Sequence, residues 1–280
     1  MKFTVLGPLT LSDDGCLRAL PTAPKTRSLL ALLVLHAGRP VPQDVCRAEL
    51  WPEEMPPTAV QSLHTRVLHV RRALADLPSV GSLRAAKQIL ATEPGGYALR
   101  LGENELDLHD LEQRLRLARQ AELARDDRKL SFALRDALSL WRGPVLGDIQ
   151  AGPLLEAHVT GLEERRVTLL EKCVEAELRL GLHRELLPEL RSLTVCFSTH
   201  ENLHAQYMVA LYRSGRVAQC LEVYHRLRDH LVSQLGIEPS PRLRELHAAV
   251  LAESPDLAWA GPGPDGQLSP LPGSRLLSAG

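Results

Sequence analysis

Strand-forming patterns in this chain are confined to about the first hundred residues, and beyond them only helical periodicity remains. The N-terminal part predicts three short strands, three helices and then a hairpin around a Pro-Gly-Gly turn. The remainder predicts helices alone, and the low aromatic content of 4% favours helix-on-helix packing. We therefore predict an α+β domain over residues 1–102 followed by an all-α domain over residues 103–252.

The element boundaries follow from the apolar spacing and the turn residues. The predicted strands cover 2–6, 9–11, 16–20, 88–93 and 97–101. The predicted helices cover 25–37, 43–51, 58–74, 108–124, 127–141, 153–180, 183–197, 200–214, 217–235 and 240–252. The first helix is apolar on most faces, so we expect it to be buried, and Gly38 follows it where a left-handed residue ends a helix.

The helical part shows a weak internal period. Gly181 and Gly215 each fall between two predicted helices, and their spacing of 34 residues is the repeat length of tetratricopeptide helix pairs. A plain helical bundle would show the same two glycines. Residues 253–280 are rich in Pro, Gly and Ser, and we predict that they form a disordered tail.

The predicted helix over 58–74 has two faces of opposite character, with Thr58 as its N-cap. Apolar residues at spacings of three and four form one stripe: Val60, Leu63, Val67, Val70 and Leu74. The opposite face carries Gln61, Ser62, Thr65, His69 and Arg72. Arg66 flanks that face, and Arg71 lies near the edge of the stripe, where its stem would cover apolar surface. Any solvated amphipathic helix would show this pattern, so it does not by itself indicate a ligand.

The net charge of −1 hides an asymmetry along the chain. Residues 1–100 hold 12 basic and 8 acidic residues, a difference of +4, whereas residues 101–280 hold 21 basic and 26 acidic residues. The segment 58–100 alone has six basic and two acidic residues. A basic N-terminal part of this kind points weakly to nucleic acid.

Several functional classes lack support in the sequence. The longest apolar run has seven residues, too few to span a membrane, and the N-terminus resembles a strand and not a signal peptide. The five cysteines are scattered, so we expect buried reduced thiols in a cytoplasmic protein. No phosphate loop, dinucleotide fingerprint, nucleophile elbow or metal-ligand spacing is present. We therefore predict no enzyme, no cofactor and no metal site.

A family resemblance is carried by a series of segments in a fixed order. They are KFTVLGPL, RSLLALLVLHAGRPV, LWPEEMPPTAV, HTRVLHVRRAL, ATEPGGYALRL, ELDLHDLE, ALSLWRGPVLGD and HENLHAQYMVALYRSGRVAQCLEVYHRLRDHLVSQLGIEPSPRLRELHAAVL. With these segments the chain resembles the Streptomyces antibiotic regulatory proteins. That family joins an OmpR-type winged helix-turn-helix to a bacterial transcriptional activation domain. Larger members append a nucleotide-binding module, and this chain, with no Walker motif, resembles the small form.

The resemblance implies a sequence-specific transcriptional activator of a secondary-metabolite gene cluster. It implies double-stranded DNA as partner, bound at direct repeats near promoters by a homodimer or side-by-side protomers, and recruitment of RNA polymerase. It implies that the 58–74 helix enters the major groove and that the hairpin is the wing. The residues expected to contact DNA are Lys25, Arg27, Gln61, Ser62, His64, Thr65, Arg66, His69, Arg71, Arg72, Lys87, Thr92, Gly95 and Gly96.

Some positions depart from the family pattern. His69 stands where the family often has Arg, and His lacks the bidentate fork with which Arg binds guanine. Leu68 occupies a commonly polar position. Two other functions remain open from the residues alone: a tetratricopeptide-like protein-interaction module, and a regulator whose helical domain senses a small ligand.

Overall fold

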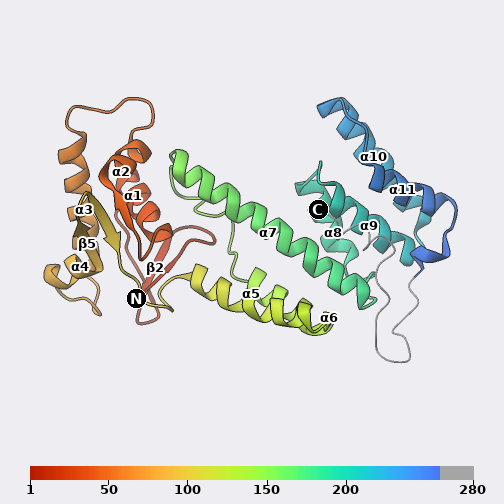
Figure 1. The fold of residues 1–280 in the computed structure, drawn as a ribbon, viewed down its shortest axis with the longest axis horizontal. Coiled ribbons are helices and arrows are strands. Elements are labelled where there is room, and N and C mark those ends of the chain that lie inside the picture. The colour runs from red at the N-terminus through yellow and green to blue at the C-terminus, as the bar shows by residue number, and fades with distance from the viewer. Residues whose placement is uncertain (259–280) are drawn as a thin grey trace. The chain divides into compact units, whose positions relative to one another are not determined.

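The computed structural model of the chain describes residues 1–258, which form two compact units (Figure 1). The first unit combines Met1–Arg116 with Asp136–Val167, and the second combines Leu117–Arg135 with the residues from Thr168 on. Each unit has its own hydrophobic core. No helix of the described residues is long and apolar enough to cross a membrane.

The first unit contains two small antiparallel sheets. The first sheet joins β1 (Lys2–Thr4), β2 (Thr10–Asp13) and β3 (Cys16–Arg18) in chain order. The second has β6 (Gly96–Leu99) in its centre, with β4 (Pro40–Pro42) on one side and β5 (Leu90–Glu93) on the other. The turn between β5 and β6 consists of two residues, Pro94 and Gly95, and Gly95 has a φ of 79°.

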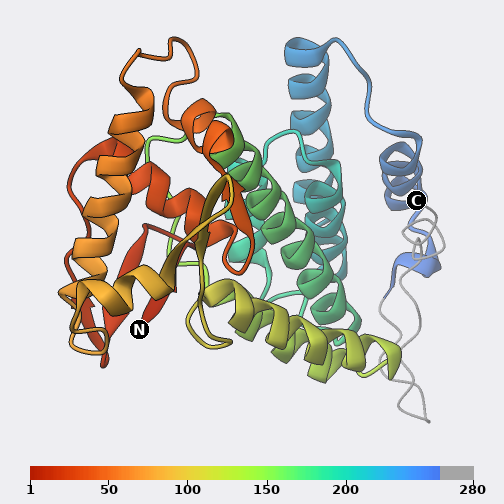
Figure 2. The same ribbon diagram turned by 60° about the vertical axis from the view of Figure 1, so that its left-hand side comes forward.

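Four helices complete the N-terminal part. The first is buried along most of its length, as its all-round apolar sequence predicts, and residues 29–34 are each at most 2% exposed. Figure 2 shows this helix (red) beside α3 (orange), and the two pack against each other. The helices are α1 (Pro24–Leu35), α2 (Gln43–Leu50), α3 (Ala59–Ala75) and α4 (Leu83–Ile89).

Two of these elements are absent from the sequence prediction. No helix was predicted over 83–89, and the strand predicted over 88–93 overlaps its end, but this segment forms α4, whose N-cap Ser82 accepts a hydrogen bond from the N–H of Ala85. Its two turns are too short to show a clear helical period. The second missed element is β4, which contains two prolines and lies at the edge of its sheet, where proline is tolerated.

Gly96 is required for the pairing of β4 with β6. A Cβ atom at this position would lie 2.3 Å from the carbonyl oxygen of Val41, which is closer than any real contact. The β5–β6 hairpin therefore lies so close to β4 that only glycine, which has no Cβ atom, fits at position 96. Gly38, with a φ of 80°, has the left-handed conformation expected after the first helix.

Residues beyond 102 also belong to the first unit. The buried carboxylate of Asp107 accepts hydrogen bonds from the backbone N–H groups of Val5 and Leu6 at 2.9–3.0 Å. Asp148 accepts one from the N–H of Leu9 at 2.8 Å. The compact unit thus extends past the boundary that the sequence predicts at residue 102, because carboxylates far along the chain satisfy backbone donors near its N-terminus.

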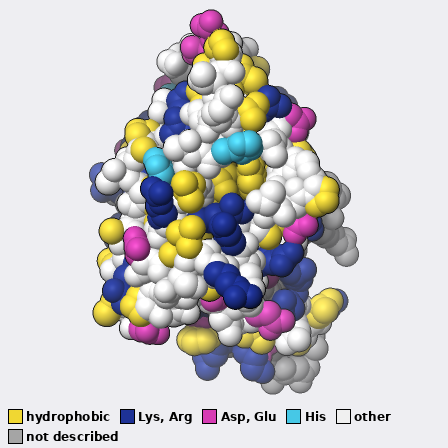
Figure 3. Space-filling view, turned by 90° about the vertical axis from the view of Figure 1, so that its left-hand side faces the viewer, with side chains coloured by type: hydrophobic (Ala, Val, Ile, Leu, Met, Phe, Trp, Pro, Cys, Tyr) yellow, Lys and Arg dark blue, Asp and Glu magenta, His cyan; other side chains and the backbone are white. Residues whose placement is uncertain are grey.

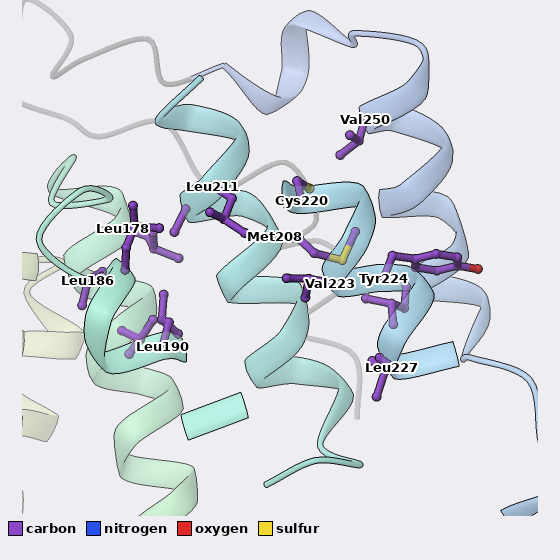
Figure 4. Close-up of a cluster of buried hydrophobic side chains, with 14 of the residues drawn as sticks. Leu178, Leu186, Leu190, Met208, Leu211, Cys220, Val223, Tyr224, Leu227 and Val250 are labelled. Carbon is purple, nitrogen blue, oxygen red and sulfur yellow. The ribbon is translucent and has the colours of Figure 1, made fainter. Parts of the chain in front are cut away.

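The second unit is helical throughout its described residues, and its helices begin and end within a few residues of the sequence prediction. Its core lies among α7–α11 and contains Leu190, Met208, Val223 and Leu227 (Figure 4). The helices from residue 107 on are α5 (Asp107–Leu123), α6 (Asp127–Leu138), α7 (Pro153–Arg179), α8 (Leu187–Cys196), α9 (Glu201–Arg213), α10 (Val217–Leu235) and α11 (Pro241–Leu251).

The helix turns at the two spaced glycines have the same backbone conformation. Gly181 follows α7 with a φ of 83°, and Gly215 follows α9 with a φ of 75°. Each of α8, α9 and α10 packs on the next helix in the chain. The 34-residue period of the sequence therefore corresponds to two successive helix–turn–helix pairs, as in tetratricopeptide arrays.

The chain continues in a defined conformation past the predicted start of the tail at residue 253. Pro255–Leu257 form a 3-10 helix, Leu257 is 3% exposed, and its carbonyl accepts a hydrogen bond from Arg213 Nε at 3.1 Å. A single apolar anchor in a polar segment gives little signal in sequence. The rest of the predicted tail, residues 259–280, lies outside the described residues.

Candidate nucleic-acid interface

Helix α3 is held on the first unit by the apolar stripe that the sequence predicts. Leu63, Val67, Val70 and Leu74 are each at most 2% exposed. Val60, the first member of the predicted stripe, is instead 38% exposed, because Ala59 occupies the buried position in the first turn. Thr58 is the N-cap as expected, although its side chain makes no capping hydrogen bond.

The outer face of α3 presents polar side chains to solvent. Ser62 is half-buried, and the hydroxyl of Thr65 donates to the carbonyl of Gln61 at 2.9 Å. On the side of the molecule where α3 lies, Figure 3 shows Lys, Arg and His side chains near the middle and Asp and Glu mostly towards the edges. The exposed residues of the predicted site on this helix are Gln61, His64, Thr65, His69 and Arg72.

Arg71 belongs to the hairpin contact and not to the open face. Its Nε and Nη2 atoms donate to the carbonyl of Leu90 at 3.0 and 2.8 Å, and Nη2 also donates to the Thr92 hydroxyl at 2.8 Å. Burial lowers the pKa of this guanidinium from its ordinary value. Arg71 therefore ties α3 to β5 and fixes the hairpin relative to the helix.

Two of the predicted cations stack on one indole ring. Lys25 Nζ lies 4.9 Å from the ring centroid of Trp51, and Arg66 Cζ lies 5.7 Å from it. Both distances suit cation–π attraction. Burial lowers the pKa of both side chains, and the positive charge of Arg66 lowers that of Lys25 further. Trp51 is half-buried and so acts as a platform that brings two positive charges together beside the first turns of α1.

Arg27 is engaged within the protein. It forms an ion pair with Asp148, the residue that also accepts a hydrogen bond from the N–H of Leu9. Its charge is thus balanced by a carboxylate within the protein.

The remaining residues that the sequence predicts as DNA contacts lie on the β5–β6 hairpin and on α4. Thr92 and Gly95 are exposed, whereas Gly96 is buried against β4. Lys87 is exposed on α4, the helix that the sequence did not predict. At the end of β6, Arg100 pairs with Glu93 at 2.6 Å.

Two further cations accompany this surface and were not predicted. Arg84 is exposed on α4, one turn before Lys87. Arg18 borders an open hollow of about 640 Å³ together with His69 and Arg72. Within residues 1–258, neither Arg72, Arg84 nor Lys87 forms an ion pair, so their charges are available to an anionic partner. The composition of segment 58–100 indicated these charges, but only the fold shows which of them remain unpaired.

The described residues hold no group of three His, Cys, Asp or Glu side chains suited to a metal ion. The surface combines three features: a polar face of α3 whose opposite side is buried, a hairpin tied to that helix by Arg71, and cations on α4 that form no ion pair within residues 1–258. A helix exposed in this way has the dimensions to enter the major groove of DNA.

Comparisons with known proteins identify the relatives of the chain. Residues 106–251 match the family described as bacterial transcriptional activator domain. The regulatory protein DnrI of Streptomyces peucetius is 41% identical over 265 residues, covering 94% of this chain and 96% of DnrI. The regulatory protein AfsR of Streptomyces coelicolor is 38% identical, covering 92% of this chain but 25% of AfsR.

A solved structure is also similar. The structure of Mycobacterium tuberculosis EmbR in complex with a low affinity phosphopeptide superposes with a TM-score of 0.81 at 34% identity, covering 91% of this chain and 65% of that chain. These relatives define the class as bacterial transcriptional regulators with an activator domain. Within that class, the chain belongs to the Streptomyces antibiotic regulatory protein family, and its match extends over nearly the whole of DnrI.

Proposed function

We propose that residues 1–102 form a winged helix-turn-helix that binds promoter DNA in a sequence-specific manner. In this proposal α3 is the recognition helix in the major groove, and the β5–β6 hairpin is the wing beside the minor groove. The observation that carries it is the attachment of the β5–β6 hairpin, through Arg71, to a helix with an open polar face. The apolar side of that helix is at most 2% exposed at four positions, while five polar side chains face solvent. The family membership supports the same assignment.

The geometry divides the predicted contact residues into groups. Gln61, Thr65, His69 and Arg72 are exposed on α3 and would read base edges. Lys87 and Arg84, both exposed on α4, would neutralise phosphates. Arg71 positions the wing through its bonds to β5, and Arg27 is occupied by Asp148, so neither is proposed as a direct contact.

The helical region 103–252 would provide activation. We propose that two protomers bind direct repeats side by side and that the activator domain helps recruit RNA polymerase. The regulated genes would be an antibiotic biosynthesis cluster, and the protein would act in the cytoplasm. The names of the relatives as regulatory proteins support this role. The modest basic excess of the N-terminal hundred residues suits it, because weak binding by one protomer makes paired sites necessary for tight binding.

Footprinting of the purified protein on promoters of its genomic neighbourhood tests the proposal. We expect protection of repeated half-sites and a steep loss of affinity with salt, because phosphate contacts release counterions. Arg72→Ala should weaken specific binding by about 1–3 kcal/mol if this side chain reads a base. Arg116→Ala, an exposed arginine on α5, is the matched control and should bind as the wild type does.

Different outcomes separate the roles. Equal loss on specific and unrelated DNA would make Arg72 a phosphate contact. Unchanged footprints for Arg72→Ala would remove it from the interface. No protected site on any neighbouring promoter, together with salt-independent behaviour, would refute DNA binding by this surface.

A further inference from the structure

Three arginines border one groove on the second unit. The groove has a volume of about 460 Å³ and is lined by α8, by α9 and by the N-terminal half of α10. The arginines are exposed and come from α8 and α10: Arg191, Arg216 and Arg226.

The guanidinium groups of these arginines have no carboxylate partner among residues 1–258. Arg226 donates only to the backbone carbonyl of Glu222, in its own helix, at 3.4 Å. Elsewhere in the same unit, Arg135 pairs with Glu177 at 2.5 Å, and Arg179 pairs with Asp127 at 2.7 Å. The groove thus concentrates three cations that no carboxylate of the described part of the chain neutralises.

The start of α10 adds positive potential to the same place. Arg216 is the N-cap of this 19-residue helix, makes no side-chain capping bond, and no acidic residue occupies the first turn. Backbone N–H groups at a helix N-terminus attract anions. Gln219, from the same turn, lines the groove and offers an amide donor and acceptor. The N-terminus of α10 and the three guanidinium groups therefore both favour a negatively charged ligand.

The floor of the groove is apolar. Leu187 and Val223 line it, are 8% and 3% exposed, and belong to the core of the unit, where Figure 4 shows Val223 beside Met208. Pro188 and Tyr207 complete this part of the lining. A large apolar side chain could rest on such a floor while charged neighbours reach the arginines.

We propose that this groove binds an acidic peptide segment of a partner protein, one that carries at least one large apolar side chain among its carboxylates. Arginine forks bind carboxylates in a bidentate manner. Glu222 is the one acidic residue of the described lining, against three arginines, so the net charge of the lining is complementary to such a segment. The arginines are solvent-exposed, which suits an extended peptide better than an enclosed small molecule. No groove residue belongs to the first unit, so the proposal does not depend on DNA binding.

Selection from a displayed library of random 12-residue peptides on the full-length protein tests the inference. The enriched peptides should contain an excess of Asp and Glu together with Leu, Ile, Phe or Trp. Synthesised with a fluorescent label, they should lose at least tenfold in affinity on the triple variant Arg191→Gln/Arg216→Gln/Arg226→Gln. Arg128→Gln, which removes an exposed arginine on α6 outside the groove, is the matched control and should change affinity less than twofold.

Three results would overturn the proposal. The first is a set of enriched peptides without acidic excess, or no enrichment. The second is equal affinity of the wild type and the triple variant, with helicity by circular dichroism showing that both are folded. The third is calorimetric binding of inorganic phosphate alone with the same dependence on the three arginines, which would make the groove a site for free anions.

Discussion

The Glu49 Oε1 atom accepts a hydrogen bond from the backbone N–H of Gly152 at 2.6 Å. The other carboxylate oxygen accepts from the N–H of Leu154 at 2.8 Å and from that of Leu155 at 3.4 Å. Glu49 is 3% exposed, so a buried side chain of α2 caps the N-terminus of α7, where the helix dipole favours a negative charge. A Cβ at Gly152 would lie 2.3 Å from the Glu49 carbonyl oxygen, so the close approach requires glycine.

Replacing Glu49 by Ala should destabilise the first unit by about 1–3 kcal/mol, because three backbone donors lose their buried acceptor. Glu49→Gln, which keeps one acceptor oxygen, should cost less. Amide hydrogen exchange at Leu154 and Leu155, together with urea denaturation, measures both effects. Glu53→Ala, an exposed neighbour, is the control. Unaltered exchange at these amides in Glu49→Ala would show that the cap does not stabilise α7.

Loss of the Arg71 side chain should loosen the hairpin. Its guanidinium makes three hydrogen bonds to β5, and lysine cannot reproduce the fork, so Arg71→Ala and Arg71→Lys should both increase amide exchange in β5 and β6. We expect a loss of about 1–3 kcal/mol in the opening free energy of these strands.

The neighbouring arginine provides the control for that experiment. Arg72 is exposed and makes no ion pair within residues 1–258, so Arg72→Ala should leave exchange in the hairpin as it is. If the two variants change exchange equally, Arg71 has no special role in positioning the hairpin.

The long helices were predictable because their apolar period extends over many turns. The range 217–235 for α10 agrees with the sequence prediction. The predicted helix 240–252 corresponds to α11, whose N-cap Ser240 accepts a hydrogen bond from the N–H of Leu243. Short elements escaped detection. β4 depends on pairing Val41 with Tyr97, a contact distant in sequence that no local pattern around Pro40 indicates.

The sequence predicted which residues of α3 face solvent, but not which of the nearby cations form ion pairs within the protein. Helical periodicity placed Gln61, His69 and Arg72 on the open face of α3. Whether a cation is free depends on partners far along the chain, such as Asp148 for Arg27, and sequence spacing carries no information about them. The capping of α7 by the buried Glu49 could not be predicted from the sequence either, because glutamate is rarely fully buried.

The cysteines should divide into two classes of reactivity. The sequence suggested five buried thiols, but Cys16 and Cys196 are exposed. Burial raises the pKa of Cys46, Cys173 and Cys220 to about 12, so these thiols stay protonated and unreactive near neutral pH. A thiol-specific reagent should therefore label two residues of the native protein quickly and all five only after denaturation. Rapid labelling of Cys173 in the native state would contradict this assignment.

His204 should make the second unit less stable in mild acid. The side chain is 7% exposed, its Nδ1 lies 3.1 Å from the carbonyl oxygen of His200, and burial lowers its pKa below the ordinary value. As the pH falls below about 6.5, the ordinary pKa of histidine, His204 binds a proton more readily in the unfolded chain than in the folded one. The stability that the neutral ring contributes is therefore complete above that pH and is lost as the pH falls through the pKa of His204 in the folded state.

Replacing His204 by Asn, which cannot ionise, should flatten this dependence. The slope of the unfolding free energy against pH should fall by up to about 1.4 kcal/mol per pH unit, the contribution of one proton. Urea denaturation between pH 5 and about 7.5 measures the slope, and NMR titration of the His204 ring measures its pKa in the folded state. A slope that is the same in wild type and variant, or a His204 pKa at or above the ordinary value, would show that burial of this ring does not control acid sensitivity.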